Sequence, residues 1–538
     1  MMHRRSLEEY CRRSRQYYIE VKMEMKENRH YQIDTDSRMP FHNRVDHCIG
    51  TGRMGLALQK EYLDQLKLVQ EEIGFRHIRG HGLFSDDMAI YQEYEDASGV
   101  KRAEYNFTYL DLVMDSYREL GLRPFLELGF MPDKMASGEQ TIFYWKGNTT
   151  PPRSYEAWCD MVTATLRHLM ERYGEDEVVN WPIEVWNEPN LPGFWKDADM
   201  QEYFKLFRYT FRAVKSLDPR FRVGGPAICG VQDELWIREF LNFCRQEEIK
   251  PDFVTRHHYT TELPEHVGHY GYAELTDAEQ GFSNLQSTRD IIDSFEEYKG
   301  TEICLTEFNT SYIPNCPLHD TNQNAAYIAQ QLSRLGDVNE SYSYWTFGDI
   351  FEEQGVPFTP FHGGFGLVAN GCIPKPTFWT FKFYQDLCGE CVLKTEDMVI
   401  LCTKDGGYQG ILWNTTRKRT GREMEITIDF PAEGEREYLF VTKTVDEDTC
   451  NPLRFWHDMG EPSHLSERQK RLLREAARPF IAERRLKAAG GNVQAALTVR
   501  EHGVVYFELY PVTMTGDRGY DYDRVMQKDL PEADRSYL

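Results

Sequence analysis

The sequence lacks the features typical of membrane, disulfide-linked and nucleic-acid-binding proteins. No apolar run follows the basic start at residues 1–15, so we expect neither a signal peptide nor a membrane span. The twelve cysteines are scattered and form no CxxC pair, which indicates reduced thiols and a cytoplasmic protein. The formal net charge of −24 argues against a nucleic acid or an anionic membrane surface as a partner.

Signatures of bound cofactors and metals are also missing. No glycine-rich phosphate fingerprint follows the first predicted strand, at residues 48–53, which disfavours an open, doubly wound dinucleotide-binding sheet. His257 and His258 are adjacent, but no HxH array with a fitting aspartate accompanies them. The cysteines around Cys391 are better explained by core packing than by a metal cluster. We therefore expect no cofactor and no metal site.

Strand-like and helix-like segments alternate eight times from residue 48 to about residue 387. Apolar positions three and four residues apart predict helices, for example within residues 58–73 and 155–173. Short apolar runs between the helices predict strands. Each helix in such a series connects two parallel strands, so the pattern predicts an α/β protein with a (β/α)8 TIM barrel over residues 41–388.

The alternation ends near residue 390. Short alternating runs beyond it predict antiparallel strands at residues 399–403, 409–413, 423–428 and 503–510. The charged stretch 465–489 predicts a helix, which Gly490 and Gly491 would end. Residues 389–538 should thus form an accessory β-sandwich with a helical segment. Residues 1–40 are a separate N-terminal segment, in which residues 17–25 predict a strand that joins the sandwich.

The sequence WPIEVWNEPN at residues 181–190 is the most informative stretch of the chain. Its apolar residues indicate a buried strand, which Pro189 ends because proline cannot extend a ladder and keeps the preceding residue out of a helix. Glu188 is thereby placed at the end of a core strand, beside Asn187 and several aromatic rings. Aromatic burial raises the pKa of a carboxyl group, and aromatic faces suit a sugar ring. A solvated turn glutamate is the alternative for this residue taken alone.

Functional side chains of such a barrel gather at the carboxyl ends of its strands. The residues predicted there are Arg53, His81, Asn187, Glu188, His257, Tyr259, Glu307 and Trp345. Glu188 and Glu307 end the fourth and seventh strands, on opposite sides of the barrel mouth. Such a pair of carboxyl groups fits glycosidic cleavage. Glu127 and Glu184 lie within their strands, so we interpret them as polar groups of the barrel interior.

Six motifs follow one another along the barrel. They are Gly50-Thr-Gly-Arg-Met-Gly55, Ile78-Arg-Gly-His-Gly82, Glu184-Val-Trp-Asn-Glu-Pro-Asn190, Val223-Gly-Gly-Pro-Ala227, Thr306-Glu-Phe-Asn-Thr-Ser311 and Phe361-His-Gly-Gly-Phe-Gly366. In content and order they resemble glycoside hydrolase family 39, in its β-xylosidase branch. The resemblance extends from about residue 46 through the barrel into the sandwich. It implies that Glu188 is the acid/base and Glu307 the nucleophile of a retaining mechanism.

The resemblance also implies the substrate contacts and the assembly. The expected contacts are Asn187 at the sugar 2-hydroxyl, His81 at another hydroxyl, His257 beside the sugar, Tyr259 at the nucleophile, Trp345 under the ring, and Glu352 and Glu353 at the non-reducing end. A cis peptide bond is implied between Trp345 and Thr346. A homo-oligomer, specifically a tetramer, is the implied assembly.

The predicted function is a retaining, exo-acting β-xylosidase that cleaves short xylo-oligosaccharides. Asp349, Glu352 and Glu353 follow the eighth strand, and residues 335–374 contain no Lys or Arg. A uronide needs a cation for its carboxylate, so three acidic groups at the pocket rim favour a neutral pentose. The alternatives are an enzyme similar to α-L-iduronidase or to an arabinosidase, and a non-catalytic sugar-binding barrel, which the two retained glutamates disfavour.

Overall fold

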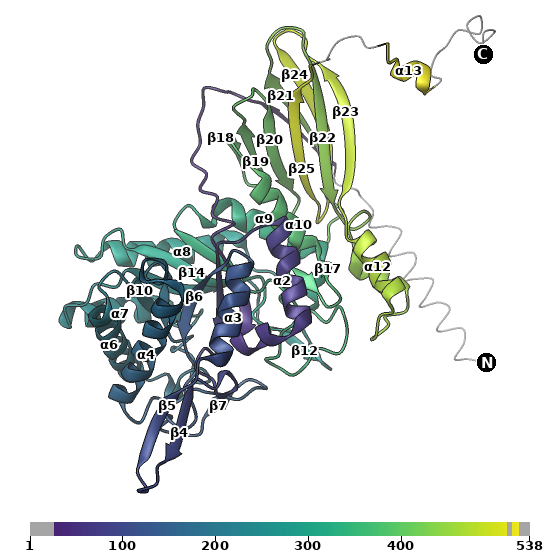
Figure 1. Ribbon diagram of the computed structural model, residues 1–538. Coiled ribbons are helices and arrows are strands. Elements are labelled where there is room, and N and C mark those ends of the chain that lie inside the picture. Colours follow the sequence, from purple (N-terminus) through teal and green to yellow (C-terminus); the bar gives the residue numbers. More distant parts are fainter. Residues whose placement is uncertain (1–25, 514–518, 527–538) are drawn as a thin grey trace, which may run out of the picture.

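Eight parallel strands close into the barrel that the sequence predicts (Figure 1). The computed structural model describes residues 26–513 and 519–526. In chain order the barrel strands are β2 (Cys48–Arg53), β3 (His77–His81), β6 (Arg123–Leu128), β9 (Ile183–Val185), β10 (Val223–Ile228), β11 (Phe253–Tyr259), β14 (Glu302–Asn309) and β15 (Ser341–Tyr344). The strand β15 pairs with β2 and so closes the ring. The predicted (β/α)8 architecture is confirmed.

Helices follow the barrel strands in turn and cover the outside of the barrel. They are α2 (Lys60–Glu72), α3 (Thr108–Glu119), α4 (Tyr155–Tyr173), α6 (Met200–Leu217), α7 (Asp233–Gln246), α8 (Ala278–Asp293), α9 (Asn322–Leu335) and α10 (Pro376–Asp386). The Ser154 hydroxyl caps α4 by accepting a hydrogen bond from the Ala157 N–H, and α4 ends at Gly174, whose φ is 95°. Within the described residues, no helix combines the length and apolar character needed to cross a bilayer.

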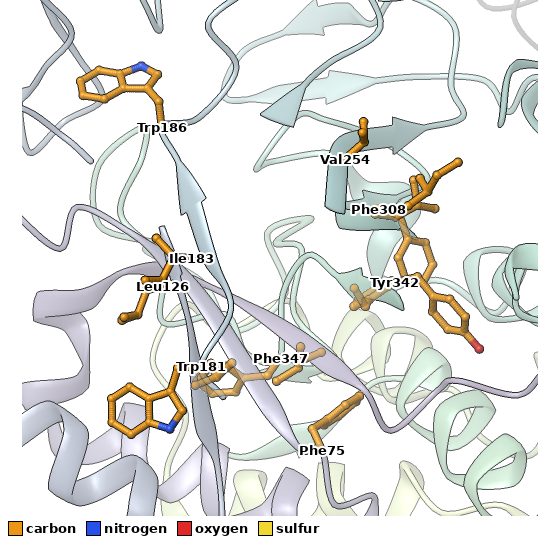
Figure 2. Packing of buried hydrophobic residues seen from close by; sticks show 14 of the residues in the cluster. Phe75, Leu126, Trp181, Ile183, Trp186, Val254, Phe308, Tyr342 and Phe347 are labelled. Carbon is orange, nitrogen blue, oxygen red and sulfur yellow. The ribbon is translucent and has the colours of Figure 1, made fainter. Parts of the chain in front are cut away.

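The barrel core lies between the outer face of the strands and the apolar stripes of the helices. Figure 2 shows part of it, including Leu126 and Ile183, which are register partners on β6 and β9. Inside the barrel, a small apolar layer closes the amino end and consists of Cys48, Phe125, Phe253 and Cys304. The charged side chains of the barrel interior lie beyond this layer, toward the carboxyl end, where they can meet a ligand.

Short hairpins extend the loops after several barrel strands. They are β4 (Tyr91–Glu95) with β5 (Lys101–Tyr105), β7 (Thr141–Ile142) with β8 (Gly147–Asn148), β12 (Glu265–Val267) with β13 (Tyr270–Tyr272), and β16 (Val368–Ala369) with β17 (Ile373–Pro374). The longest, β4–β5, projects from the barrel on the side away from the sandwich (Figure 1). None was predicted from the sequence, because each strand is too short to show a period.

The sandwich packs a six-stranded sheet against a three-stranded sheet. The larger sheet has the order β18 (Glu390–Lys394), β19 (Met398–Cys402), β20 (Tyr408–Trp413), β25 (Val504–Pro511), β22 (Glu437–Val445) and β23 (Phe480–Lys487). The smaller sheet has the order β1 (Lys26–Gln32), β21 (Glu423–Pro431) and β24 (Asn492–Arg500). The larger sheet also packs on α9 and α10, where the rings of Phe383 and Tyr506 stack with centroids 5.4 Å apart. The sandwich is therefore fixed directly to the barrel.

Two details differ from the sequence prediction. The predicted helix at 465–489 is wrong in its second half, because α11 (Pro452–Asp458) and α12 (Glu467–Ala476) are followed by the edge strand β23. The capping box of Ser466 and Gln469 starts α12, whereas Gly490 and Gly491 lie at positive φ between β23 and β24. The predicted strand at residues 17–25 lies outside the described residues, and β1 joins the sandwich as its neighbour in the chain.

Candidate active site

A buried guanidinium, Arg79 of β3, lies at the centre of the polar barrel interior. Its Nε donates to Glu184 Oε2 at 2.7 Å, and its Nη1 donates to Glu307 Oε1 at 2.7 Å. Its Nη2 donates to Asn187 Oδ1 at 2.8 Å and lies 2.9 Å from Glu127 Oε2. A guanidinium holds its donors in a rigid fork, so Arg79 fixes four side chains from three other strands and their ends relative to one another.

Glu307 faces into the barrel because the ladder of β14 is irregular at this point. The register of β14 against β11 and β15 shifts between Leu305 and Phe308. As a result Thr306 and Glu307 both contact groups of the barrel interior, although they are adjacent in sequence. A bulge that turns a side chain inward is common beside active sites. Strict alternation would direct only one of the two residues inward.

Three donors surround the carboxylate of Glu307. Arg79 takes Oε1, the Tyr259 hydroxyl donates to Oε2 at 2.6 Å, and His81 Nε2 lies 3.6 Å from Oε1. Burial raises the pKa of Glu307, whereas Arg79, His81 and Tyr259 act in the opposite direction. Donors on both oxygens favour the charged form of a carboxyl group. Of the two mouth glutamates, Glu307 is thus the one suited to stay ionised.

Glu188 occupies a different environment. It follows β9 in the left-handed region, with φ 47°, and its residue is 6% exposed. Oε1 lies 2.8 Å from His257 Nδ1, and the Cys229 thiol is nearby. Burial, and then the negative charge of Glu307, raise the pKa of Glu188 well above its ordinary value. Burial also lowers the pKa of His257, so this neighbour stays neutral. Glu188 therefore holds a proton more readily than Glu307 does.

The two carboxyl groups converge on one ring nitrogen. His257 Nδ1 lies 2.8 Å from Glu188 Oε1 and 3.5 Å from Glu307 Oε2. Even the sum of these two distances is below the roughly 6.5–9.5 Å that separates the carboxyl groups of inverting glycosidases. The two nearest oxygens are therefore closer together than the carboxyl groups of an inverting pair. This spacing suits direct attack by one carboxylate and proton transfer by the other.

Aromatic rings border the ionic cluster. Trp345 is 2% exposed, and its ring centroid lies 4.6 Å from that of His81 and 5.8 Å from the Arg79 guanidinium carbon. The Asn309 side chain donates to the Trp345 carbonyl at 2.5 Å. The peptide bond between Trp345 and Thr346 is cis, as the family resemblance implies. The indole is thus held against the groups that contact Glu307, where a sugar ring could stack on it.

The acidic loop after β15 differs from the prediction at Asp349. Asp349 is fully buried and pairs with Lys375 Nζ at 2.7 Å, so its predicted place at the pocket rim is wrong. Lys375 lies one residue beyond the stretch that lacks basic side chains. Glu352 does lie near the mouth, but its carboxylate pairs with Arg53 Nη2 at 2.6 Å. Glu353 alone faces the cluster, with Oε1 3.8 Å from His81 Nε2.

A cavity of about 430 Å³ opens beside Glu353. It lies between the β12–β13 hairpin and the loop after β15, and its walls include His269, Tyr270, Phe351 and Phe358. Its volume falls within the range of small-ligand pockets, roughly 300–1,000 Å³. Of the residues that face the carboxyl cluster, Glu353 lines this cavity.

The site contains one set of potential metal ligands. Within the described residues, Glu188, Cys229 and His257 form the only such group of three, with ligand atoms within 4.8 Å of one another. These are residue types that bind zinc. The hydrogen bond between Glu188 and His257 already pairs two of the ligand atoms. We therefore interpret Glu188 and His257 as a hydrogen-bonded pair and assign no role to Cys229.

Comparison with known proteins identifies the family of this chain. The family model described as Glycosyl hydrolases family 39 covers residues 30–494. The chain belongs to glycosyl hydrolases family 39. A β-xylosidase of Geobacillus stearothermophilus is 46% identical over 491 residues, which are 89% of this chain and 95% of that protein. A β-xylosidase of Caldicellulosiruptor saccharolyticus is 36% identical over 431 residues, 78% and 86% of the two chains. The crystal structure of a monomeric β-xylosidase from Caulobacter crescentus CB15 superposes with a TM-score of 0.82 at 31% identity, and the match covers 90% of this chain and all of that chain.

This family 39 glycoside hydrolase thus brings together most of the site residues predicted from its sequence. His81, Asn187, Glu188, His257, Tyr259, Glu307, Trp345 and Glu353 all border the same cluster, and Glu352 lies at its edge. No role was predicted for Arg79, which organises the cluster, or for Cys229. The available signal for Arg79 was its place in a predicted core strand, two residues before the strand-end residue His81.

Proposed function

We propose that this glycoside hydrolase is a retaining, exo-acting β-xylosidase that removes terminal β-D-xylosyl residues from short xylo-oligosaccharides. The observation that carries the proposal is the pair of carboxyl groups that meet at His257 Nδ1 in unlike environments. Glu307 has charged and hydroxyl donors, whereas Glu188 has a neutral imidazole. The names of the two similar β-xylosidases, 46% and 36% identical over most of this chain, support the substrate class.

In the first step, a Glu307 oxygen attacks the anomeric carbon of the sugar. The bond between that carbon and the glycosidic oxygen breaks, and Glu188 gives its proton to the departing oxygen. The product is a glycosyl ester on Glu307. Because the hydroxyl of Tyr259 and the guanidinium of Arg79 hold the carboxylate in place, the attack needs little reorganisation of Glu307.

In the second step, water replaces the glycosyl group. Glu307 is now an uncharged ester, so the charge that helped Glu188 to keep its proton is gone. Glu188 can then remove a proton from the attacking water, which releases the sugar with its original configuration and restores both carboxyl groups. One residue thus acts first as an acid and then as a base, because its neighbour changes charge between the two steps.

The charges around the pocket favour a neutral sugar over a uronide. The two arginines that border the site are engaged: Arg79 contacts three carboxyl groups, and Arg53 pairs with Glu352 and Asp87. Glu353 faces the sugar-binding space, where its oxygens can accept hydrogen bonds from sugar hydroxyl groups. Burial and the neighbouring glutamates raise the pKa of Glu353 well above its ordinary value, so it offers a substrate carboxylate no positive charge.

Hydrolysis of four nitrophenyl glycosides tests the proposal: the β-xyloside, α-arabinoside, β-glucoside and an iduronide. The β-xyloside should have the highest kcat/KM. The variant Glu353→Gln should raise KM for the β-xyloside more than Glu352→Gln does, because only Glu353 faces the cluster unpaired. Preference for the iduronide would replace the proposal with an iduronidase-like function. Binding of xylose without hydrolysis of any substrate would favour a sugar-binding barrel.

We also propose a cytoplasmic homo-oligomer. The scattered thiols of the sequence support a reducing compartment, and the family resemblance supports an assembly. The Caulobacter crescentus protein, which superposes well on this chain, is described as monomeric, so assembly is not uniform among similar proteins. Light scattering on the purified chain would decide, and a mass of one subunit would end the oligomer proposal.

A further inference from the structure

The ionic cluster at the barrel mouth contains more carboxyl groups than cations. Glu127, Glu184 and Glu307 all contact Arg79, whose side chain is fully buried. A buried carboxylate is stable only when it is paired and hydrogen-bonded, because burial disfavours the charged form. One guanidinium cannot neutralise three carboxylates. We therefore expect at least one of these three groups to carry a proton.

The hydrogen bonds single out Glu127. Glu184 receives Arg79 Nε on Oε2 and the Thr306 hydroxyl on Oε1. Glu307 likewise has donors on both oxygens. Glu127 is contacted only through Oε2, while its buried Oε1 has no partner among the described side chains. A bare oxygen disfavours the charged form of the carboxyl group.

The imidazole of His81 gives an independent argument. Its Nδ1 lies 2.6 Å from Glu127 Oε2, and its Nε2 lies 3.6 Å from Glu307 Oε1 and 3.8 Å from Glu353 Oε1. Burial lowers the pKa of His81 to about 3, so the ring is neutral and carries one N–H. Two acidic oxygens near Nε2 favour that N–H on Nε2. The nitrogen Nδ1 then has a lone pair, and Glu127 must supply the proton between them.

We propose that Glu127 is a neutral carboxylic acid whose O–H donates to His81 Nδ1, so that His81 presents its Nε2–H to the sugar between Glu307 and Glu353. Glu127 is then a positioning residue that acts through His81. Burial raises the pKa of Glu127 to about 8, which agrees with a proton at neutral pH. The inference rests on the proposed function only in naming a sugar hydroxyl as the acceptor of this N–H.

The surroundings keep this arrangement in place. The rings of Phe130, Phe143 and Trp345 border the imidazole, with centroids 5.9, 5.9 and 4.6 Å from that of His81. Charged and titratable groups from four strands and two loops face the Glu127–His81 pair. They are Arg79 on β3, Glu184 on β9, Glu188 in the loop after β9, His257 on β11, Glu307 on β14 and Glu353 in the loop after β15. Above about pH 8 Glu127 would lose its proton and become an acceptor. The proton of His81 would then move from Nε2 to Nδ1 and donate to Glu127. The sugar would then face a lone pair in place of a donor.

Substitutions of Glu127 distinguish a neutral Glu127 from an ionised one. In Glu127→Gln the amide N–H can replace the acid O–H as donor to His81 Nδ1. Arg79 Nη2 then loses the oxygen that lies 2.9 Å from it but keeps its bond to Asn187. We expect kcat/KM to stay within about tenfold of wild type and the alkaline loss of activity that stems from Glu127 to disappear. Glu127→Leu has no donor and should lose about a hundredfold or more. If Glu127 were ionised, Glu127→Gln would impose the wrong tautomer, and the loss would reach several orders of magnitude.

Two physical measurements make the test independent of activity. The infrared difference spectrum between wild type and Glu127→Gln should contain the band of one protonated carboxyl group, whereas the difference between wild type and Glu184→Gln, the matched control, should not. The band of protonated Glu188 is common to all three proteins and cancels. Neutron diffraction from wild-type crystals should place a deuteron on His81 Nε2. A bare Nε2, or a difference spectrum between wild type and Glu127→Gln that lacks the acid band, would overturn the inference. A substrate other than a xyloside would leave both measurements unchanged and would refute the proposed function alone.

Discussion

Tyr259→Phe should move the acidic limb of the pH–activity profile to higher pH. The Tyr259 hydroxyl donates to Glu307 Oε2 at 2.6 Å, inside a buried cluster. A hydrogen bond to a charged group contributes roughly 1.5–3 kcal/mol. Since about 1.4 kcal/mol corresponds to a tenfold change in proton affinity, the loss of this bond should move the limb upward by about one to two pH units.

The direction follows from the role proposed for Glu307. Attack requires the ionised carboxylate, so activity falls when the pH drops below the pKa of Glu307. The Tyr259 hydroxyl lowers that pKa against the effect of burial, because it stabilises the charged form. Its removal therefore raises the pKa and causes activity to fall at a higher pH. Arg79 still donates to Oε1, so the variant should keep activity on the alkaline side of the limb.

The assay is kcat/KM for nitrophenyl β-xyloside as a function of pH, for wild type and variant. Tyr312→Phe is the matched control, because the ring of Tyr312 lies 6.3 Å from that of Tyr259 and the residue is 41% exposed. This control should leave the limb in place. An unchanged limb in a fully folded Tyr259→Phe would refute the reasoning, since Glu307 would then not be the group that sets the acidic limb.

Three further predictions concern the carboxyl pair and its support. Glu307→Ala should lower turnover at least roughly a thousandfold, and added azide should restore a glycosyl azide of inverted configuration; unchanged turnover would exclude Glu307 as the nucleophile. Glu188→Ala should spare the first step for good leaving groups and impair it for poor ones, and equal losses for both would place the acid elsewhere. Lys375→Met should destabilise the fold by about 3–5 kcal/mol in denaturant unfolding, because buried Asp320 and Asp349 would lose their shared cation. Lys382→Met removes the ion pair of Lys382 with Asp386, whose side chains are 26% and 25% exposed, and should cost only about 0–1 kcal/mol. Equal losses in the two variants would refute the argument.

The sequence by itself determined the architecture and pointed to the candidate pair of carboxyl groups. Eight alternations of strand and helix leave few solutions besides a barrel, because each crossover helix requires parallel neighbours. The turn at Pro189 placed Glu188 at a strand end, and the motif around Glu307 placed a second carboxyl group on the seventh strand. These features are local, so they are visible in the order of the residues.

Tertiary structure alone decided which charges meet. Residues 480–487 carry a charged pattern that also suits a helix, and only pairing with β22 makes them the edge strand β23. Asp349 has no basic residue near it in the chain before Lys375, yet the two are in contact inside the fold. The bulge in β14 directs both Thr306 and Glu307 inward, and Arg79 on β3 then joins carboxyl groups from three other strands. Ion pairs and register shifts depend on closure of the barrel, because closure brings together side chains that are distant in the chain. No local sequence pattern predicts which of these side chains will be in contact.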